Sequence, residues 1–182
     1  MYQIKYLDER FQDGTWAKPR YATSGSAGLD LVAALPASDI LYLAPNQSVL
    51  VPTGIAIWLD DSARVGLIFP KSGKGSKGLV LGNLTGVIDS DYQGELKVSL
   101  WNRTDETIMI RPGDAIAQYI VTTAFRIGFH EVSEFTDASK RGEGGFGSTG
   151  ECTVDQSLIE KPDIVPTEPP KYIGGVQAAT QE

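Results

Sequence analysis

The sequence predicts an all-β domain built as an antiparallel sandwich or jelly roll. Short runs rich in β-branched residues follow one another along the chain, and Gly, Pro, Asn and Asp separate them. Gly and Pro together supply 20 and 10 of the 182 residues, which favours many turns. No stretch shows a long apolar period near 3.6 residues, so a helical bundle or coiled coil is disfavoured.

The strands are expected in the order in which these runs occur. Within the run 96–100, Leu-Lys-Val-Ser-Leu alternates strictly, so one face of that strand should meet solvent. At most one short helix is expected, near residues 60–63. The expected strands are 3–7, 29–33, 48–52, 55–59, 64–69, 79–81, 95–101, 107–111 and 115–122.

Composition excludes several classes of function. Asp and Glu number 23 against 16 Lys and Arg, a net charge of -7, so bulk attraction to nucleic acid is not expected. The longest apolar runs are a few residues, which predicts no membrane span. Residues 1–20 lack an apolar signal region, and the only cysteine is Cys152. A cytoplasmic protein without internal disulfides is therefore expected, and the single histidine, His130, disfavours a His-rich metal site.

Three parts are expected along the chain. Residues 1–140 form the β domain, 141–150 a glycine-rich mobile arm, and 151–182 an acidic extension. This last part carries four of the ten prolines, at positions 162, 166, 169 and 170, so it should be extended or disordered. It either has no role, docks a protein partner, or packs on the domain.

Two glycine-rich segments match the letters G-x-G-x-x-G, at 73–78 and 142–147. Neither lies between an expected strand and an expected helix, so the pattern does not indicate a dinucleotide fold. Glycine-rich backbone can still turn its N–H groups toward an anion. Segment 70–77 adds three lysines and two serines, and segment 141–150 adds an arginine, a phenylalanine and hydroxyls. Both are candidates for a polyphosphate site, with ordinary surface turns as the alternative.

An acidic turn follows the first of these loops. The segment 86–95, Gly-Val-Ile-Asp-Ser-Asp-Tyr-Gln-Gly-Glu, lies between two strand signals. We expect a hairpin that presents its backbone edge and the carboxylate of Asp89. The alternative is a turn with ordinary Asp and Gly chemistry.

Five segments follow one another in order: Ala27-Gly28-Leu29-Asp30-Leu31, Pro70-Lys71-Ser72-Gly73, the acidic turn 86–95, Arg111-Pro112-Gly113-Asp114 through Gln118, and Arg141 through Gly150. Taken together, they resemble the motifs of the trimeric dUTPases (deoxyuridine triphosphate nucleotidohydrolases). The resemblance spans about residues 20–150, and five ordered motifs are specific. It implies a jelly-roll-like barrel, a homotrimer with three sites at subunit junctions, Mg²⁺ as cofactor, and cleavage of dUTP to dUMP and pyrophosphate.

The resemblance also implies roles for single residues. Asp89 matches the carboxylate that activates the attacking water, and Tyr92 the ring beneath the deoxyribose. A uracil-reading edge is implied for Asn83, Gly86, Val87 and Ile88, with Lys97 at a flanking contact. Lys71, Ser72 and Gly73 match the phosphate loop. Asp30 and Gln118 match residues that hold the triphosphate–metal arrangement, largely through water. Arg141, Phe146, Gly147, Ser148 and Thr149 match the mobile arm that closes over the substrate.

One position departs from the family pattern. Lys71 stands where an arginine is usual, and lysine keeps the charge but loses the bidentate fork. Two rival functions stay open: a dCTP deaminase of the same fold, and a nucleotide-gated interaction protein whose acidic tail recruits a partner.

Overall fold

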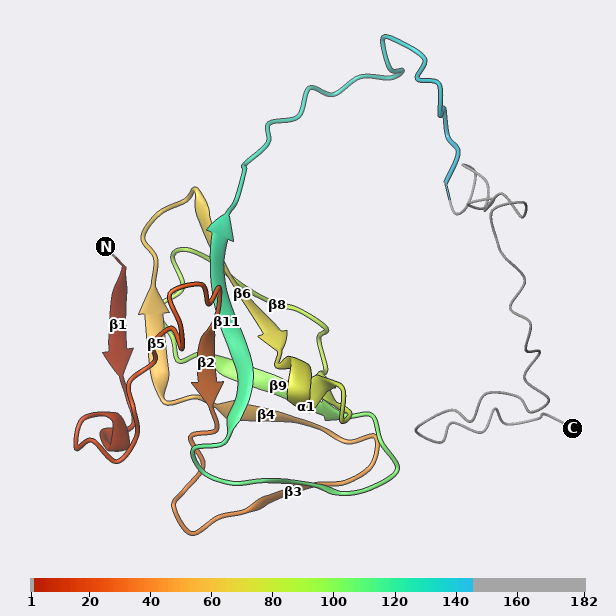
Figure 1. The fold of residues 1–182 in the computed structure, drawn as a ribbon. Helices are drawn as coiled ribbons and strands as arrows, with labels where there is room; N and C mark the ends of the chain where they lie inside the picture. The colour runs from red at the N-terminus through yellow and green to blue at the C-terminus, as the bar shows by residue number, and fades with distance from the viewer. Residues whose placement is uncertain (1, 146–182) are drawn as a thin grey trace, which may run out of the picture. The chain divides into compact units, whose positions relative to one another are not determined.

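β-strands supply nearly all the regular structure in this computed structural model, which describes residues 2–145 (Figure 1). The strands are β1 (Gln3–Tyr6), β2 (Leu29–Val32), β3 (Leu41–Leu43), β4 (Ser48–Pro52), β5 (Ile55–Trp58), β6 (Arg64–Pro70), β7 (Leu79–Leu81), β8 (Gly86–Ile88), β9 (Lys97–Asn102), β10 (Ile108–Ile110) and β11 (Ala115–Thr123). A four-stranded sheet has the order β2-β11-β6-β8, and a three-stranded sheet the order β4-β9-β7. Two further pairs are β1-β5 and β10-β3, and every pairing is antiparallel.

Both larger sheets contribute to one apolar core. From the four-stranded sheet come Leu31, Ile68 and Tyr119, and from the three-stranded sheet Val98 and Leu100, all almost fully buried. Alternate residues of β9 are buried while Lys97 is exposed, as the period-two pattern of the sequence predicts. Burial of such side chains is the main stabilising term for a domain of this kind. The expected all-β, antiparallel jelly-roll fold is confirmed.

The helix expected near residues 60–63 was wrong. Asp60 has φ of 47°, a left-handed conformation that no right-handed helix contains, and Asp61 Oδ1 accepts a hydrogen bond from the Ala63 N–H at 2.9 Å in a turn. The described residues instead contain a 3-10 helix, η1 (Glu9–Phe11), and one α-helical turn, α1 (Ser72–Gly75). The α1 turn lies inside the predicted phosphate loop.

The expected hairpin around Asp89 was also wrong. β8 pairs with β6, whereas β9 pairs with β4 and β7. The two strands that flank the acidic turn therefore belong to different sheets, and the turn crosses between them. Eight residues separate Ile88 from Lys97, which is longer than most hairpin loops.

Two compact units divide the chain, residues 1–129 and residues 130–182. All the strands belong to the first unit. The predicted boundaries at 140 and 150 stay predictions, and residues 146–182 lie outside the described part. No helix of the described residues has the length and apolarity needed to cross a membrane.

Candidate active site

Three neighbouring strands bring the predicted phosphate residues together. In the β2–β11 ladder Gln118 lies opposite Asp30, and in the β11–β6 ladder it lies opposite Phe69. The Gln118 side chain Nε2 donates to the carbonyl of Pro70 at 3.0 Å. A Cβ at Gly28 would lie 3.1 Å from Gln118 Oε1, so glycine leaves room for this amide. Register alone therefore places Asp30, Gln118 and the end of β6 side by side.

The phosphate loop begins where β6 ends. Lys71 is extended, with φ -76° and ψ 134°, and precedes α1. Its carbonyl accepts backbone hydrogen bonds from Lys74 and Gly75 at 3.1 and 2.7 Å, which closes the turn. The Lys71 ammonium pairs with the carboxylate of Asp30. Ser72 and Gly73 are exposed, as the predicted ligand-binding loop requires.

A second ion pair in this region was not predicted. Lys74 Nζ lies 3.6 Å from Asp114 Oδ2, and the same carboxylate oxygen accepts a hydrogen bond from the Arg111 N–H at 3.0 Å. Asp114 occupies the turn before β11. Its place in the Arg-Pro-Gly-Asp segment was visible in the sequence, but nothing there indicated which lysine it would meet.

The acidic turn holds its own residues in place. Tyr92 N–H donates to the Asp89 carbonyl at 3.2 Å, and Tyr92 Oη donates to the Glu95 carbonyl at 3.0 Å. A Cβ at Gly94 would lie 2.4 Å from Tyr92 Oη, so the ring occupies space that only glycine leaves. Glu95 Oε1 accepts from the Gly54 N–H at 2.9 Å and ties the turn to the strands. The turn thus presents a fixed aromatic ring beside Asp89.

A cavity of about 270 Å³ lies beside this turn. It brings together Val87, Asp89, Tyr92 and Lys97 as predicted, and adds Leu50. Asp89 is exposed and makes no side-chain hydrogen bond within residues 2–145, so both oxygens are accessible to a water. Gly86 is buried in β8, whereas Asn83 lies exposed in the preceding turn.

The two groups of residues lie at opposite ends of β6. Gly66 pairs with Ile88, so the next position along places Asp89 level with Val65, while Lys71 follows the other end of β6. Six residues of strand span about 20 Å. Within one chain the structure therefore does not bring Asp89 next to Lys71, Asp30 or Gln118.

The arm is described only in part. Arg141 is exposed in a turn in which Gly144 N–H donates to the Arg141 carbonyl at 3.1 Å, and Gly142 has φ of 52°. Phe146, Gly147, Ser148 and Thr149 lie outside the described residues.

The carboxylates of the described residues fit a metal ion that is bound mainly by a substrate's phosphates. Across residues 2–145 no three His, Cys, Asp or Glu side chains gather into a metal-holding group. Mg²⁺ retains waters and is commonly bound by one or two carboxylates plus substrate phosphates. Asp30, a single carboxylate with a half-exposed side chain beside the phosphate loop, fits such a water-mediated role.

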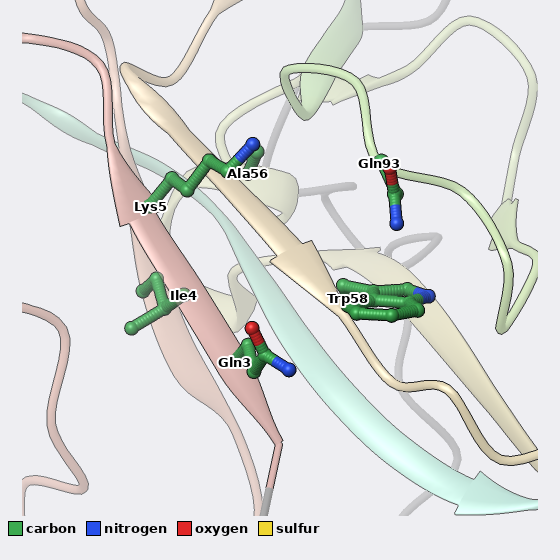
Figure 2. Close-up of a pocket in the computed structure, with 6 residues that line it drawn as sticks. All are labelled: Gln3, Ile4, Lys5, Ala56, Trp58 and Gln93. Carbon is green, nitrogen blue, oxygen red and sulfur yellow. The ribbon is translucent and has the colours of Figure 1, made fainter.

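A different cavity, of about 220 Å³, lies along β1 and β5. Figure 2 shows its lining, in which Gln93 from the acidic turn faces the ring of Trp58, with Gln3, Ile4 and Lys5 on β1. It contains none of the predicted nucleotide-binding residues.

Fold and site together are those expected of a jelly-roll nucleotide hydrolase, with lysines in the predicted phosphate loop and an exposed carboxylate in the acidic turn. A sequence model of the family described as dUTPase matches residues 15–150. The chain is 54% identical over 149 residues to the deoxyuridine 5'-triphosphate nucleotidohydrolase of Legionella pneumophila (strain Paris), covering 81% of this chain and 95% of the relative. The chain belongs to the dUTPase family, as the five motifs predicted.

Two further comparisons agree. The Acinetobacter baylyi deoxyuridine 5'-triphosphate nucleotidohydrolase is 50% identical over 150 residues, 82% of this chain and 97% of that protein. The solved structure of the Staphylococcus bacteriophage 80alpha dUTPase with dUpNHpp aligns at a TM-score of 0.70 and 26% identity, covering 83% of this chain and 99% of that chain.

Proposed function

We propose that this chain hydrolyses dUTP to dUMP and pyrophosphate, and that each active site is completed by other copies of the chain in a homotrimer. One observation carries the second part: Asp89 lies level with one end of β6 and Lys71 follows its other end, about 20 Å away along the strand. A general base must act within hydrogen-bond reach of its water. The base turn of one copy must therefore meet the phosphate loop of another.

Exposed apolar side chains support an assembly of copies. After β11, Phe125, Ile127 and Phe129 alternate along the chain, and the two phenylalanines are each 89% exposed. Leu50 and Val87, beside the cavity at the base turn, are exposed as well. Apolar groups gathered on a surface mark contacts with protein or ligand.

Asp89 is the proposed general base. Its accessible oxygens hold a water in line with the α-phosphorus and take its proton as the oxygen–phosphorus bond forms and pyrophosphate leaves. The Tyr92 ring packs against the deoxyribose, where it leaves no room for a 2′-hydroxyl. The backbone of Gly86, Val87 and Ile88, with Asn83 and Lys97 beside it, reads the uracil edge.

The phosphate loop neutralises the leaving group. Lys71 and the N–H and hydroxyl groups of Ser72 and Gly73 contact phosphate oxygens. Gln118 on β11 holds the Pro70 carbonyl at the start of this loop. Mg²⁺, which the family generally uses, would be held mainly by the triphosphate, with Asp30 acting through water. Arg141, Phe146, Gly147, Ser148 and Thr149 close over the substrate. The acidic extension 151–182 is a candidate partner segment, and the proposed location is the cytoplasm.

Substrate choice tests the activity. Pyrophosphate release is measured from dUTP, dCTP, dTTP and UTP, with Mg²⁺ and with a chelator. We expect turnover of dUTP with Mg²⁺ and little of the others, because polar discrimination by a fitted site reaches about 10⁴. Ammonia released from dCTP would instead identify a deaminase.

Mixing two impaired variants tests the shared site. Asp89→Asn and Lys71→Ala chains are prepared separately, then unfolded and refolded together in equal amounts. If base and phosphate loop come from different copies, about a quarter of the sites in random trimers receive both intact groups, and activity returns. If both came from one chain, no site would contain both, and the mixture would be no more active than the mean of its two components.

A further inference from the structure

Carboxylates already neutralise two lysines of the phosphate loop. Lys71 pairs with Asp30 on β2, and Lys74 pairs with Asp114 in the turn before β11. Two positive charges thus meet two negative charges. An arriving phosphate finds little net attraction from these groups, because each lysine lies beside an acid that competes for it.

The two acids differ in their freedom to change partner. Asp114 also accepts the Arg111 N–H at 3.0 Å, which fixes its carboxylate to its own turn. The Asp30 carboxylate accepts no side-chain hydrogen bond other than that from Lys71 within residues 2–145, and its side chain is 54% exposed. Asp30 is therefore the acid that can leave its lysine at small cost.

The loop has anchors that do not involve the Lys71 side chain. Gln118 Nε2 holds the Pro70 carbonyl immediately before it, at 3.0 Å. Further along the loop, Lys74 forms an ion pair with Asp114. The Lys71 carbonyl accepts backbone hydrogen bonds from Lys74 and Gly75 in the α1 turn. The ammonium of Lys71 can exchange Asp30 for a phosphate oxygen while the loop stays in place.

We propose that Asp30 competes with the substrate for Lys71, and that a divalent cation carried by the triphosphate relieves this competition by attracting Asp30. The inference rests on the proposed function. It makes Asp30 a positioning residue that couples the availability of Lys71 to the metal. A triphosphate without metal meets an occupied lysine and an additional negative charge. A triphosphate with metal draws Asp30 away and finds Lys71 free.

Binding of the non-hydrolysable analogue dUpNHpp to the full-length chain tests this coupling. Its Kd is measured by calorimetry at fixed ionic strength, with Mg²⁺ and with a chelator, for the unmodified chain and Asp30→Asn. In chelator we expect Asp30→Asn to bind about two- to fivefold tighter, the range of a half-exposed ion pair. With Mg²⁺ the gain should vanish or reverse, so the metal dependence of binding shrinks.

Glu9→Gln is the matched control. It removes the same charge from an exposed residue of η1 that makes no side-chain hydrogen bond or ion pair among residues 2–145. Its Kd values should equal those of the unmodified chain. A gain in chelator as large as that of Asp30→Asn would show a general charge effect and overturn the proposal.

Two more comparisons decide the interpretation. If Asp30→Asn binds the analogue more weakly in chelator, Asp30 only holds the loop in place. If its binding in chelator is unchanged, Asp30 interacts with the metal alone. Either result overturns the proposal. In a Lys71→Ala background the gain should shrink to the part that comes from removing the negative charge of Asp30. A gain as large as in the unmodified background would show that Lys71 is not the contested group. Failure of the unmodified chain to bind the analogue with Mg²⁺ would refute the proposed function itself.

Discussion

The two ends of β6 are built differently. At the Pro70 end, side chains from β2, β11 and α1 are joined by ion pairs and a hydrogen bond within one chain. At the other end, Asp89 is exposed and its side chain is unpaired within residues 2–145, while Tyr92 and Glu95 are held by backbone groups. One end is held together by contacts within the chain, whereas the other presents an exposed carboxylate. Under the proposed function this difference makes assembly of copies part of catalysis, because neither end could act alone.

The largest effect should come from the outward-facing end. Asp89→Asn removes the proton acceptor but keeps the size of the side chain, so turnover of dUTP should fall by roughly 10²–10⁴. Binding of dUpNHpp should change little, since the exposed Asp89 supports no other side chain. Steady-state kinetics and calorimetry measure the two quantities. Near-normal turnover would remove Asp89 from the role of base.

The Pro70 end should respond next. Lys71→Ala removes a charged donor to phosphate, and kcat/KM for dUTP should fall about ten- to hundredfold, as for hydrogen bonds to charged groups. Lys71→Arg keeps the charge and should recover most of the loss, because a guanidinium can form two parallel hydrogen bonds to a phosphate. An equal loss in both variants would show that shape, not charge, matters at this position.

A smaller effect is expected where the base turn is tightest. Gly94→Ala places a Cβ 2.4 Å from Tyr92 Oη, so the ring must move. We expect kcat/KM for dUTP to fall about tenfold and discrimination against UTP to weaken. The control is Gly25→Ala, because a Cβ there meets nothing within 4 Å. If both variants behave like the unmodified chain, the position of the Tyr92 ring does not determine discrimination between deoxyribose and ribose.

The smallest effect should lie in the core that both ends share. Burial raises the pKa of Tyr119 to about 12, and its hydroxyl has no hydrogen-bond partner within residues 2–145. Tyr119→Phe removes an unpaired polar group, so the free energy of unfolding should stay the same or rise by about 1 kcal/mol. Denaturant unfolding at neutral pH measures it, and a clear loss of stability would reveal a partner for the hydroxyl.

The same residue predicts an alkaline pH dependence. The folded pKa of Tyr119 exceeds the unfolded value of 10.0, so its contribution to stability is complete below pH 10 and is lost as pH rises toward 12. Unfolding of Tyr119→Phe between pH 10 and 12 should lack this part of the loss of stability.

The Asp8 carboxyl gives a pH dependence in the opposite direction. Its hydrogen bond with Arg10 lowers its pKa, so its contribution to stability is lost as pH falls through the acidic range.

Much of the fold was readable from local pattern. The runs 48–52 and 79–81 match β4 and β7 fully, because turn residues bound them on both sides. β3 was missed since Leu41–Leu43 is a three-residue strand without β-branched residues. The α1 turn was missed because Ser-Gly-Lys-Gly has low helix propensity, and here backbone closure after β6 decides its shape.

The amino-acid order determined which chemical groups this protein carries and in which motifs, since strand alternation and motif letters are local properties. Tertiary structure decided their partners. It placed β8 beside β6 and β9 in another sheet, separated Asp89 from Lys71, and joined Lys71 to Asp30 and Lys74 to Asp114. Ion pairs and strand neighbours depend on distances between segments far apart in the chain, and those distances are set only when the sheets pack around a common core.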